Sequence, residues 1–274
     1  MTTTLLHISD PHFGDPNGVL NRQEVSQVLG TLLDKTGSDV FVVLSGDISF
    51  KGQAHGYAEA QQALFDVFDR KMVRRDRIIV CPGNHDLVKL PSSVSPFEAF
   101  DAWSVALRRD KHCTFSTDSC RRLTSPEIDF LLINSAHHGG IEFGLVDLNK
   151  MEAVLADMDA TPIQGLPRVA VLHHHLVPVL REDSSTTRNA HNVLTRLAKR
   201  GFSLVLHGHQ HALLELGIGA GSMKVHGVSS FRYSTQGFLN GATVYCIDES
   251  KRITAEHFAI SKDAPNLLRA IKDI

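Results

Sequence analysis

The sequence predicts a layered α/β fold with helices on the outside. Five short apolar runs, at residues 4–8, 40–44, 78–80, 169–172 and 204–206, are interpreted as strands, and each ends abruptly in polar or glycine residues. Their hydrophobicity is continuous rather than alternating, which is typical of strands buried on both faces. Helical patterns lie between these runs, and such alternation favours helices packed on the faces of a sheet.

Four stretches carry apolar residues at helical spacing. The first covers residues 25–33 and stops near Gly37, and the others cover residues 57–68, 148–158 and 193–198. Because each lies between two predicted strands or beside one, we expect these helices to form the outer layers.

The last part of the chain changes character. Residues 223–228, 242–247 and 253–260 are predicted to be consecutive strands separated by turns, and a final helix is expected from about Pro265.

We expect residues 1–274 to form a single domain, because this length lies within the range of large single α/β domains. The stretch at about 87–129 breaks the rhythm of strands and helices, with prolines, basic residues and Trp103. It is predicted to be an insertion near the mouth of the site. A lid, a dimer contact and a local core remain open for it.

The overall charge excludes some classes of partner. The formal net charge is -2, without a block of like charges, so neither nucleic acid nor an acidic membrane is an expected partner. No apolar run approaches the ~20 residues of a membrane span, and the N-terminus lacks the features of a signal peptide. The four cysteines are scattered without a CxxC pair, so we expect reduced thiols and a cytoplasmic protein. The oligomeric state stays open.

Polar clusters follow each of the five predicted strands. They are Asp10-x-His12, Gly46-Asp47, Gly83-Asn84-His85-Asp86, His173-His174-His175 and Gly208-His209-x-His211. Each alone could be a turn or a helix cap. Ligands of open α/β sheets bind where the carboxyl ends of strands meet, so the clusters should converge. Imidazole and carboxylate suit manganese, iron or zinc. Since the donors are too many for one tetrahedral ion, we expect two ions that share a carboxylate.

This series of motifs resembles the signature of the calcineurin-like metallophosphoesterase superfamily, and it spans residues 10 to 211. The resemblance implies a four-layer α/β/β/α sandwich of two mixed sheets. It also implies a first metal held by Asp10, His12 and His211, a second held by Asn84, His173 and His209, and Asp47 as the bridge between them. In this pattern His85 faces the leaving group, and Asp86 orients it or supports it electrostatically.

The chemistry expected of this centre is metal-dependent hydrolysis of a small-molecule phosphoester, with nucleotides among the candidate substrates. Two divalent ions ~3.5–4 Å apart lower the pKa of a bridging water, and the resulting hydroxide attacks phosphorus without a phosphoenzyme. A positioned histidine, here His85, protonates the departing alkoxide and is worth about 10²–10⁴ in rate.

The motifs also separate branches of the superfamily. The stretch Gly46-Asp-Ile-Ser-Phe-Lys-Gly52 lacks the second aspartate and the arginine of serine/threonine protein phosphatases. No tyrosine near Asp47 matches the tyrosinate ligand of purple acid phosphatases. The pattern of Gly46, Gly52 and Tyr57 is similar to small bacterial class III cyclic-nucleotide phosphodiesterases. That group usually has His-His-Pro-Pro where this chain has His173-His174-His175-Leu176.

The leading interpretation is therefore a phosphodiesterase, with 3',5'-cyclic nucleotides as the specific candidate. A phosphomonoesterase or a nucleotide pyrophosphohydrolase with the same site is the alternative. A scaffold of the same fold without turnover is a third reading, but such proteins typically lose a ligand or the catalytic histidine, and none is missing here.

Other polar residues have simpler expected roles. His7 lies inside the first predicted strand and is expected in the core. His174, His175 and His207 flank the proposed ligands and are expected to support them through hydrogen bonds. The basic run at residues 108–111 is a candidate for recruiting phosphate.

Overall fold

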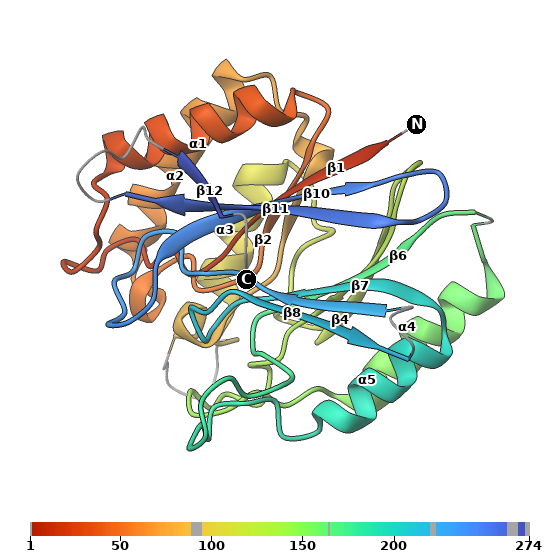
Figure 1. The fold of residues 1–274 in the computed structure, drawn as a ribbon. Coiled ribbons are helices and arrows are strands. Elements are labelled where there is room, and N and C mark those ends of the chain that lie inside the picture. Colours follow the sequence, from red (N-terminus) through yellow and green to blue (C-terminus); the bar gives the residue numbers. More distant parts are fainter. Residues whose placement is uncertain (1, 89–94, 164, 220–222, 262–267, 272–274) are drawn as a thin grey trace.

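Two six-stranded sheets dominate the computed structural model, which describes residues 2–88, 95–163, 165–219, 223–261 and 268–271. The sheets face one another in the middle of the molecule, and helices cover their outer faces (Figure 1). The predicted four-layer α/β/β/α sandwich of two mixed sheets is confirmed.

The first sheet has the strand order β12-β11-β10-β1-β2-β3. Its strands are β1 (Thr3–Ile8), β2 (Phe41–Leu44), β3 (Ile78–Val80), β10 (Asn240–Ile247), β11 (Ile253–Ile260) and β12 (Leu268–Ile271). β1, β2 and β3 are parallel, whereas β10 pairs antiparallel with β1 and β11, and β12 pairs antiparallel with β11. The carboxyl ends of β1, β2 and β3 therefore lie at one edge of the sheet.

The second sheet has the order β4-β5-β6-β7-β9-β8. Its strands are β4 (Cys120–Thr124), β5 (Asp129–Ile133), β6 (Arg168–Leu172), β7 (Phe202–His207), β8 (Leu214–Ile218) and β9 (Met223–Gly227). The four central strands are parallel, and the two edge strands are antiparallel to their neighbours. This sheet also gathers the carboxyl ends of its central strands at one edge.

The helices divide between the two sheets. α1 (Arg22–Thr36), α2 (Ala54–Arg70) and α3 (Glu98–Arg108) pack beside the first sheet, and α4 (Leu148–Ala160) and α5 (Ala190–Lys199) cover the second (Figure 1). Three single-turn 3₁₀ helices are η1 (Phe50–Gly52), η2 (Arg75–Arg77) and η3 (Asn84–Asp86). α1 begins with a capping box, in which Asn21 and Glu24 each accept the backbone N–H of the other.

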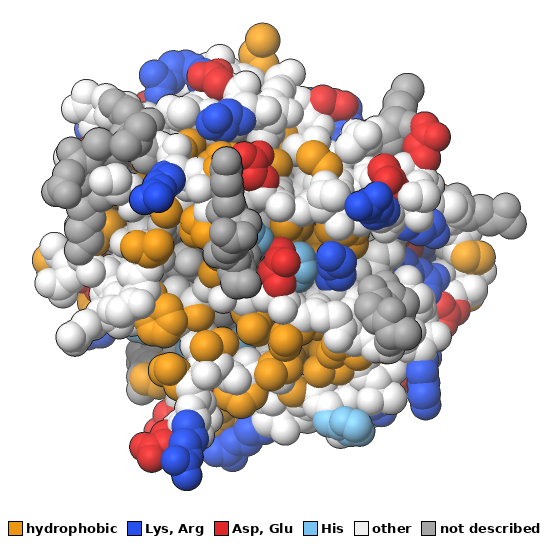
Figure 2. Space-filling model, in the orientation of Figure 1, with side chains coloured by type: hydrophobic (Ala, Val, Ile, Leu, Met, Phe, Trp, Pro, Cys, Tyr) orange, Lys and Arg blue, Asp and Glu red, His pale blue; other side chains and the backbone are white. Residues whose placement is uncertain are grey.

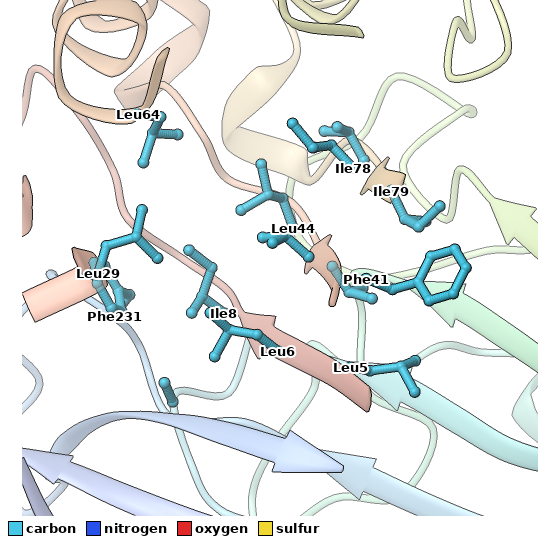
Figure 3. Close-up of a cluster of buried hydrophobic side chains, with 14 of the residues drawn as sticks. Leu5, Leu6, Ile8, Leu29, Phe41, Leu44, Leu64, Ile78, Ile79 and Phe231 are labelled. Carbon is cyan, nitrogen blue, oxygen red and sulfur yellow. The ribbon is translucent and has the colours of Figure 1, made fainter. Parts of the chain in front are cut away.

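The five strands predicted from continuous hydrophobicity are largely buried on both faces. In β5, Phe130 and Leu132 join the core between the sheets, while Leu131 and Ile133 pack toward the helices of the outer layer. Figure 3 shows the core around β1, β2 and β3, where Leu29 of α1 and Leu64 of α2 lie against the first sheet. This packing on both faces fixes the positions of the strand ends.

The five strands and four helices predicted in the body of the chain are present, with ends shifted by a few residues. The prediction of a final helix from about Pro265 is wrong at residues 268–271, which form β12, antiparallel to β11. The rest of that predicted helix lies outside the described residues. β11 would otherwise expose a row of unpaired backbone groups, and Leu268 packs against the core. β8 was missed because its half-exposed, alternating pattern differs from the buried runs. Part of the turn predicted at residues 219–221 lies outside the described residues.

The stretch predicted to be an insertion contributes regular structure, in the form of α3 and β4. Trp103 is 4% exposed and packs its ring near Tyr57 and Phe100, so this side chain belongs to the core. That this stretch is an insertion near the mouth of the site, and that the chain forms a single domain, both stay predictions.

The surface carries charges of both signs. Figure 2 shows basic and acidic side chains interspersed over one face of the molecule, as a net charge of -2 would suggest. All four cysteines are free thiols. Among the helices that the structure describes, none combines the length and apolarity that a membrane crossing demands.

Candidate metal centre

The carboxyl ends of strands from both sheets meet at one edge of the sandwich. After β1, the N–H of Asp10 donates to the carbonyl of Gly46, which follows β2, at 3.1 Å. After β6 of the second sheet, His173 Nδ1 donates to the carbonyl of Ser45 at 2.8 Å. The first bond joins the ends of two neighbouring strands, and the second joins the two sheets, so the predicted convergence of the polar clusters is observed.

Asp10, His12 and His211 form a first group, with their ligand-type atoms within 4.8 Å of one another. His211 Nε2 lies 3.2 Å and His12 Nε2 lies 3.9 Å from Asp10 Oδ1. Asp10 Oδ1 and His12 Nε2 are buried and have no hydrogen-bond partner among the described residues. Since buried polar atoms nearly always have a partner, this group fits a cation held between its members.

Asp47, His173 and His209 form a second group, and Asn84 joins it. His173 Nε2 lies 3.1 Å from Asn84 Oδ1, 3.1 Å from His209 Nδ1 and 3.2 Å from Asp47 Oδ2. Neighbouring ligands of an ion are about 3.0–3.4 Å apart when each is ~2.1 Å from it. The carbonyl of Ser45 can only accept, so a neutral His173 carries its proton on Nδ1 and turns a bare Nε2 toward the other donors.

The carboxylate of Asp47 connects the two groups. Its Oδ2 lies 3.5 Å from His12 Nε2 and 3.2 Å from His173 Nε2. Its Oδ1 accepts the backbone N–H of His85 at 2.8 Å. One oxygen is thereby fixed by the backbone, and the other lies between the groups, where a bridging carboxylate would have to be.

Five of the predicted ligands have a left-handed backbone, with φ values of 53° for Asp10, 43° for His12, 54° for Asp47, 69° for His209 and 55° for His211. Among the described residues, nine non-glycine residues have positive φ, so more than half of them lie in this site. Each such residue costs about 1–3 kcal/mol and persists only where the surrounding structure holds it. The fold therefore maintains strain at the convergence of the strand ends.

Two glycines of the motifs leave no room for a side chain. A Cβ at Gly83 would lie 2.1 Å from Asp47 Oδ1, and a Cβ at Gly208 would lie 2.4 Å from Asp10 Oδ2. Both separations are far inside van der Waals contact. Glycine is required because each loop passes directly against a carboxylate from another motif.

Burial and opposite charges compete in this site. Burial raises the pKa of Asp10 and of Asp47, but neighbouring histidines outweigh it and hold both pKa values below their usual range. Burial lowers the pKa of His12 to about 4 and that of His209 to about 3. Burial also disfavours a charged His173, yet Asp47 and Asp10 raise its pKa to about 9. The two carboxylates thus stabilise positive charge between the groups, which a metal ion would supply in place of that proton.

His85 lies beside the first group. Its ring is 4.7 Å from the ring of His12, edge to face at 86°, and it stacks on Phe50 at 5.6 Å and 21°. His85, His12 and Asp47 form a third set of close ligand-type atoms. Because His85 is partly exposed, a substrate at the centre could reach its ring.

Asp86 is fully buried and holds the loops around the site together. Its carboxylate accepts four hydrogen bonds of 3.0–3.1 Å, from the N–H groups of Ile48, Ser49 and Gly83 and from the hydroxyl of Tyr57. Burial, together with Asp47, raises its pKa to about 6 despite these donors. Among the described residues no hydrogen bond joins Asp86 to His85, so any effect on that ring passes through the backbone.

Several other predicted residues also have defined places. His7 is fully buried in β1, with Nε2 2.7 Å from Ser45 Oγ, and belongs to the core as predicted. His174 Nδ1 lies 2.8 Å from Ser135 Oγ, and its ring lies 4.4 Å from the ring of His209. His174 is therefore placed to support His209.

In the basic run at residues 108–111, Arg108 does not fit the predicted role of recruiting phosphate. Arg108 is 3% exposed, donates to the carbonyl of Ile78 and pairs with Asp110. Ile78 is the first residue of β3, so this cluster lies at the amino end of the strand, whereas the candidate centre lies at the carboxyl end.

Two loops contribute contacts that the sequence analysis missed. Asp183 accepts a hydrogen bond from Gln210 Nε2 at 2.6 Å and contacts His175 Nε2. Thr235 Oγ1 lies 2.6 Å from His211 Nδ1, and the ring of Tyr233 lies 4.8 Å from that of His12. The only local signal was the position of Gln210 between two predicted ligands.

The donor set and its geometry fit a centre of two divalent metal ions. Each group combines carboxylate oxygen with imidazole nitrogen, and both contact the same Asp47 oxygen. Thiolates are absent from the described site, which favours manganese, iron or zinc over ions that prefer soft ligands.

Comparison with known proteins places these features in a wider context. A family model described as calcineurin-like phosphoesterase matches residues 3–213. No curated protein sequence matches the chain.

Solved structures share the fold at low sequence identity. A dimetal phosphatase from Danio rerio has a TM-score of 0.60 at 12% identity, over 89% of this chain and 95% of that one. GAP50, the anchor in the inner membrane complex of Plasmodium, has a TM-score of 0.61 at 10% identity, over 99% and 88%. Phosphopantetheinyl hydrolase from Mycobacterium tuberculosis has a TM-score of 0.52 at 16% identity, over 83% and 90%. At these identities the likeness establishes the fold alone.

Proposed function

Given that the chain belongs to the calcineurin-like phosphoesterase family, we propose that it hydrolyses phosphodiester bonds at a centre of two divalent metal ions. The family makes the chain a metal-dependent phosphoesterase, and the kind of ester is our proposal. The observation that supports the dinuclear centre is the position of Asp47 Oδ2, which lies 3.5 Å from His12 Nε2 and 3.2 Å from His173 Nε2. A carboxylate oxygen shared by two donor groups is what a pair of closely spaced ions requires.

The proposed ligands follow the two groups of donors. Asp10, His12 and His211 hold the first ion, Asn84, His173 and His209 hold the second, and Asp47 holds both. Asn84 donates its Nδ2 to the carbonyl of Ile141 at 3.3 Å, which turns its Oδ1 toward His173. A neutral amide oxygen in the second set leaves that ion more electrophilic than a third carboxylate would.

When bound, the two ions lower the pKa of a shared water and offset the charge on the phosphoryl oxygens. The protein's own contribution to bond cleavage is assigned to His85, which protonates the leaving oxygen. Its backbone is held by Asp47, and its ring is held between Phe50 and His12. Asp86 is assigned as a positioning residue, because it fixes the loops that carry Asp47 and Gly83.

Within this class, 3',5'-cyclic nucleotides are the leading specific substrates, by resemblance to small bacterial cyclic-nucleotide phosphodiesterases. Two residues of the shared pattern support the site. Tyr57 donates its hydroxyl to Asp86, and Gly52 turns the chain with a φ of 62° after Phe50.

One observation favours the alternative, a phosphomonoesterase or a nucleotide pyrophosphohydrolase. The guanidinium of Arg188 lies 3.4 Å from the centre of the Phe143 ring, and the backbone N–H of Arg188 donates to the carbonyl of Gly144. Among the described residues, no carboxylate forms an ion pair with Arg188. An exposed guanidinium held flat in this way presents donors suited to a second anionic group on the substrate.

The test is hydrolysis of bis(p-nitrophenyl) phosphate beside p-nitrophenyl phosphate, with added Mn²⁺ and then with a chelator. We expect diester turnover that requires the metal and is restored when Mn²⁺ is returned. Turnover of the monoester alone would move the assignment to a phosphatase. Absence of both activities from protein with two bound ions would contradict the proposal.

A further inference from the structure

Exposed apolar side chains gather on the loops that carry or touch the candidate metal centre. Among the described residues six large hydrophobic side chains are exposed, and four of them lie on these loops: Ile141 (49%), Val179 (43%), Leu180 (53%) and Leu239 (64%). We call these four residues the apolar rim.

Three members of the rim lie on loops that form hydrogen bonds with a proposed ligand or with its neighbour in the chain. The carbonyl of Ile141 accepts a hydrogen bond from Asn84 Nδ2 at 3.3 Å. The N–H of Val179, next to Leu180, donates to Gln210 Oε1 at 3.1 Å. Gln210 lies between His209 and His211 in the chain, so this loop is fixed beside both groups of donors.

Leu239 belongs to a turn on the side of the first group. In this turn Phe238 N–H donates to the carbonyl of Thr235 at 3.2 Å, and the Thr235 hydroxyl lies 2.6 Å from His211 Nδ1. The next residue, Asn240, donates its Nδ2 to the carbonyl of Tyr233 at 2.9 Å. Tyr233 is a partly exposed aromatic residue whose ring lies 4.8 Å from that of His12.

The other two exposed hydrophobic residues provide a contrast. Met72 is 76% exposed between α2 and β3, and Ile163 is 41% exposed between α4 and β6. Both precede a parallel strand and therefore lie at the amino edge of a sheet, away from the centre. Isolated apolar residues of this kind are ordinary on a protein surface, whereas a concentration around one site marks contact with an apolar group.

We propose that the apolar rim binds an alkyl or aryl group of the substrate. This group is carried by the ester oxygen that stays bonded to phosphorus when the leaving group departs. This rests on the proposed phosphodiesterase function but departs from its cyclic-nucleotide candidate, because both ester oxygens of a cyclic nucleotide belong to one polar ribose. It narrows the function to diesters whose retained alcohol is apolar. The metal centre takes the charged phosphoryl group, and the rim removes the neighbouring hydrocarbon from water. Contact with a part of the substrate that does not react is expected to change KM more than kcat.

The experiment uses a series of alkyl p-nitrophenyl phosphodiesters, with methyl, propyl and hexyl groups, and the full chain loaded with Mn²⁺. The leaving group is the same in every ester, so only the retained alkyl group changes. We expect kcat/KM to rise along the series, by up to about fourfold for each methylene that becomes buried. The variant Ile141→Ser/Leu180→Ser should flatten this rise, whereas Met72→Ser, a control at the opposite edge, should keep it.

The outcomes separate this inference from the function on which it rests. Turnover of all three esters with no dependence on chain length would overturn the rim and leave the phosphodiesterase intact. The same rise in the double variant as in the wild type, or an equal loss in Met72→Ser, would also overturn it. No turnover of any ester by the metal-loaded protein would remove the proposed function and this inference together.

Discussion

His85 differs from the proposed ligands around it in both backbone and surroundings. It lies in η3 without the positive φ shared by Asp10, His12 and Asp47, and its ring is held by Phe50 and His12 rather than by a hydrogen-bond acceptor. A ring that is fixed in plane and still partly exposed suits proton transfer to a substrate. A ligand, in contrast, needs one nitrogen committed to the ion.

We therefore expect His85→Ala to lower kcat by about 10²–10⁴ while two metal ions remain bound per chain. Bis(p-nitrophenyl) phosphate hydrolysis and metal analysis of the purified variant measure the two quantities. His191→Ala, an exposed histidine on α5, is the control and should match the wild type. Nearly undiminished hydrolysis by His85→Ala would show that the assigned role is wrong.

The tight packing around Gly208 leads to a second prediction about a single residue. A Cβ there would lie 1.9 Å from Ser9 Oγ and 2.4 Å from Asp10 Oδ2, so Gly208→Ala must displace a proposed ligand or its own loop. We expect weaker metal binding and a lower free energy of unfolding, measured by metal titration and by urea unfolding.

The matched control is Gly30→Ala in the middle of α1. A Cβ at Gly30 meets its nearest atom, Lys71 Cε, at 3.6 Å, which is ordinary contact. Alanine in a helix is favoured over glycine by about 0.5–1 kcal/mol, so this variant should be more stable and bind metal normally. Equal effects in the two variants would mean that the close approach at Gly208 has no consequence for the site.

Motifs and supporting residues differed in how far the sequence could predict them. The clusters at Asp10, Asp47 and His173 each follow a strand directly, so the geometry of the sheets brings them together without further information. Asp183 and Thr235 reach the site through loops whose path no local spacing encodes. Their contacts depend on the folded chain, and a single sequence gives no signal for them.

The loop between β6 and α5 holds residues around the candidate metal centre in place. Its Asp183 contacts His175, whose ring stacks on His209 at 5.5 Å and 16°, and it accepts a hydrogen bond from Gln210 at 2.6 Å. The side chain of Asp183 is 7% exposed. One carboxylate thus holds both the ring beside a proposed ligand and the residue between two proposed ligands.

Asp183→Asn should weaken binding of the second ion by about 10–100-fold and affect the first ion less. His175 and Gln210 both contact Asp183 Oδ2, whereas Oδ1 accepts two hydrogen bonds from Ser185. The amide keeps the size of the side chain but has one oxygen and no charge, so either the contacts with His175 and Gln210 or those with Ser185 are lost. Stepwise titration of the metal-free protein with Zn²⁺ measures both affinities. Asp118→Asn, on a partly exposed aspartate paired with Lys150 and Arg121, serves as the control. Loss of turnover with both affinities unchanged would contradict this assignment.

Most strands with unbroken apolar runs were predictable, including the edge strand β3, although the buried strand β5 was missed. The edge strands β8 and β12 were not predictable. β2 and β6 carry unbroken apolar runs because helices or the other sheet cover each face. β8 and β12 are edge strands with half-exposed patterns, so their residues carry little information about burial. What defines them is pairing with β9 and β11, an interaction that only the assembled sheet provides.

Across the whole molecule, buried histidines connect folding to pH. Burial, assisted by His207, lowers the pKa of His7 to about 3, and burial lowers the pKa of His226 to about 4. Both lie on strands, in β1 and β9, away from solvent. In the unfolded chain these rings titrate near their ordinary pKa of about 6.5. The unfolded state therefore takes up protons at a pH where the folded state does not.

The difference between the folded and unfolded pKa values sets the direction in which the free energy of unfolding changes with pH. The folded pKa of His7 is the lower one, so its cost to folding is absent above about pH 6.5 and grows as the pH falls toward about 3. Between pH 7 and pH 5 the loss from His7 alone is about 2 kcal/mol. Glutamine at this position cannot take up a proton, so His7→Gln should lose that much less over the same interval, whatever its stability at pH 7. Urea unfolding with chelator present, at pH 7, 6 and 5, measures the difference between the two slopes. Parallel slopes would mean that His7 is protonated in the folded protein, and that its contact with Ser45 holds a charged ring rather than a neutral one.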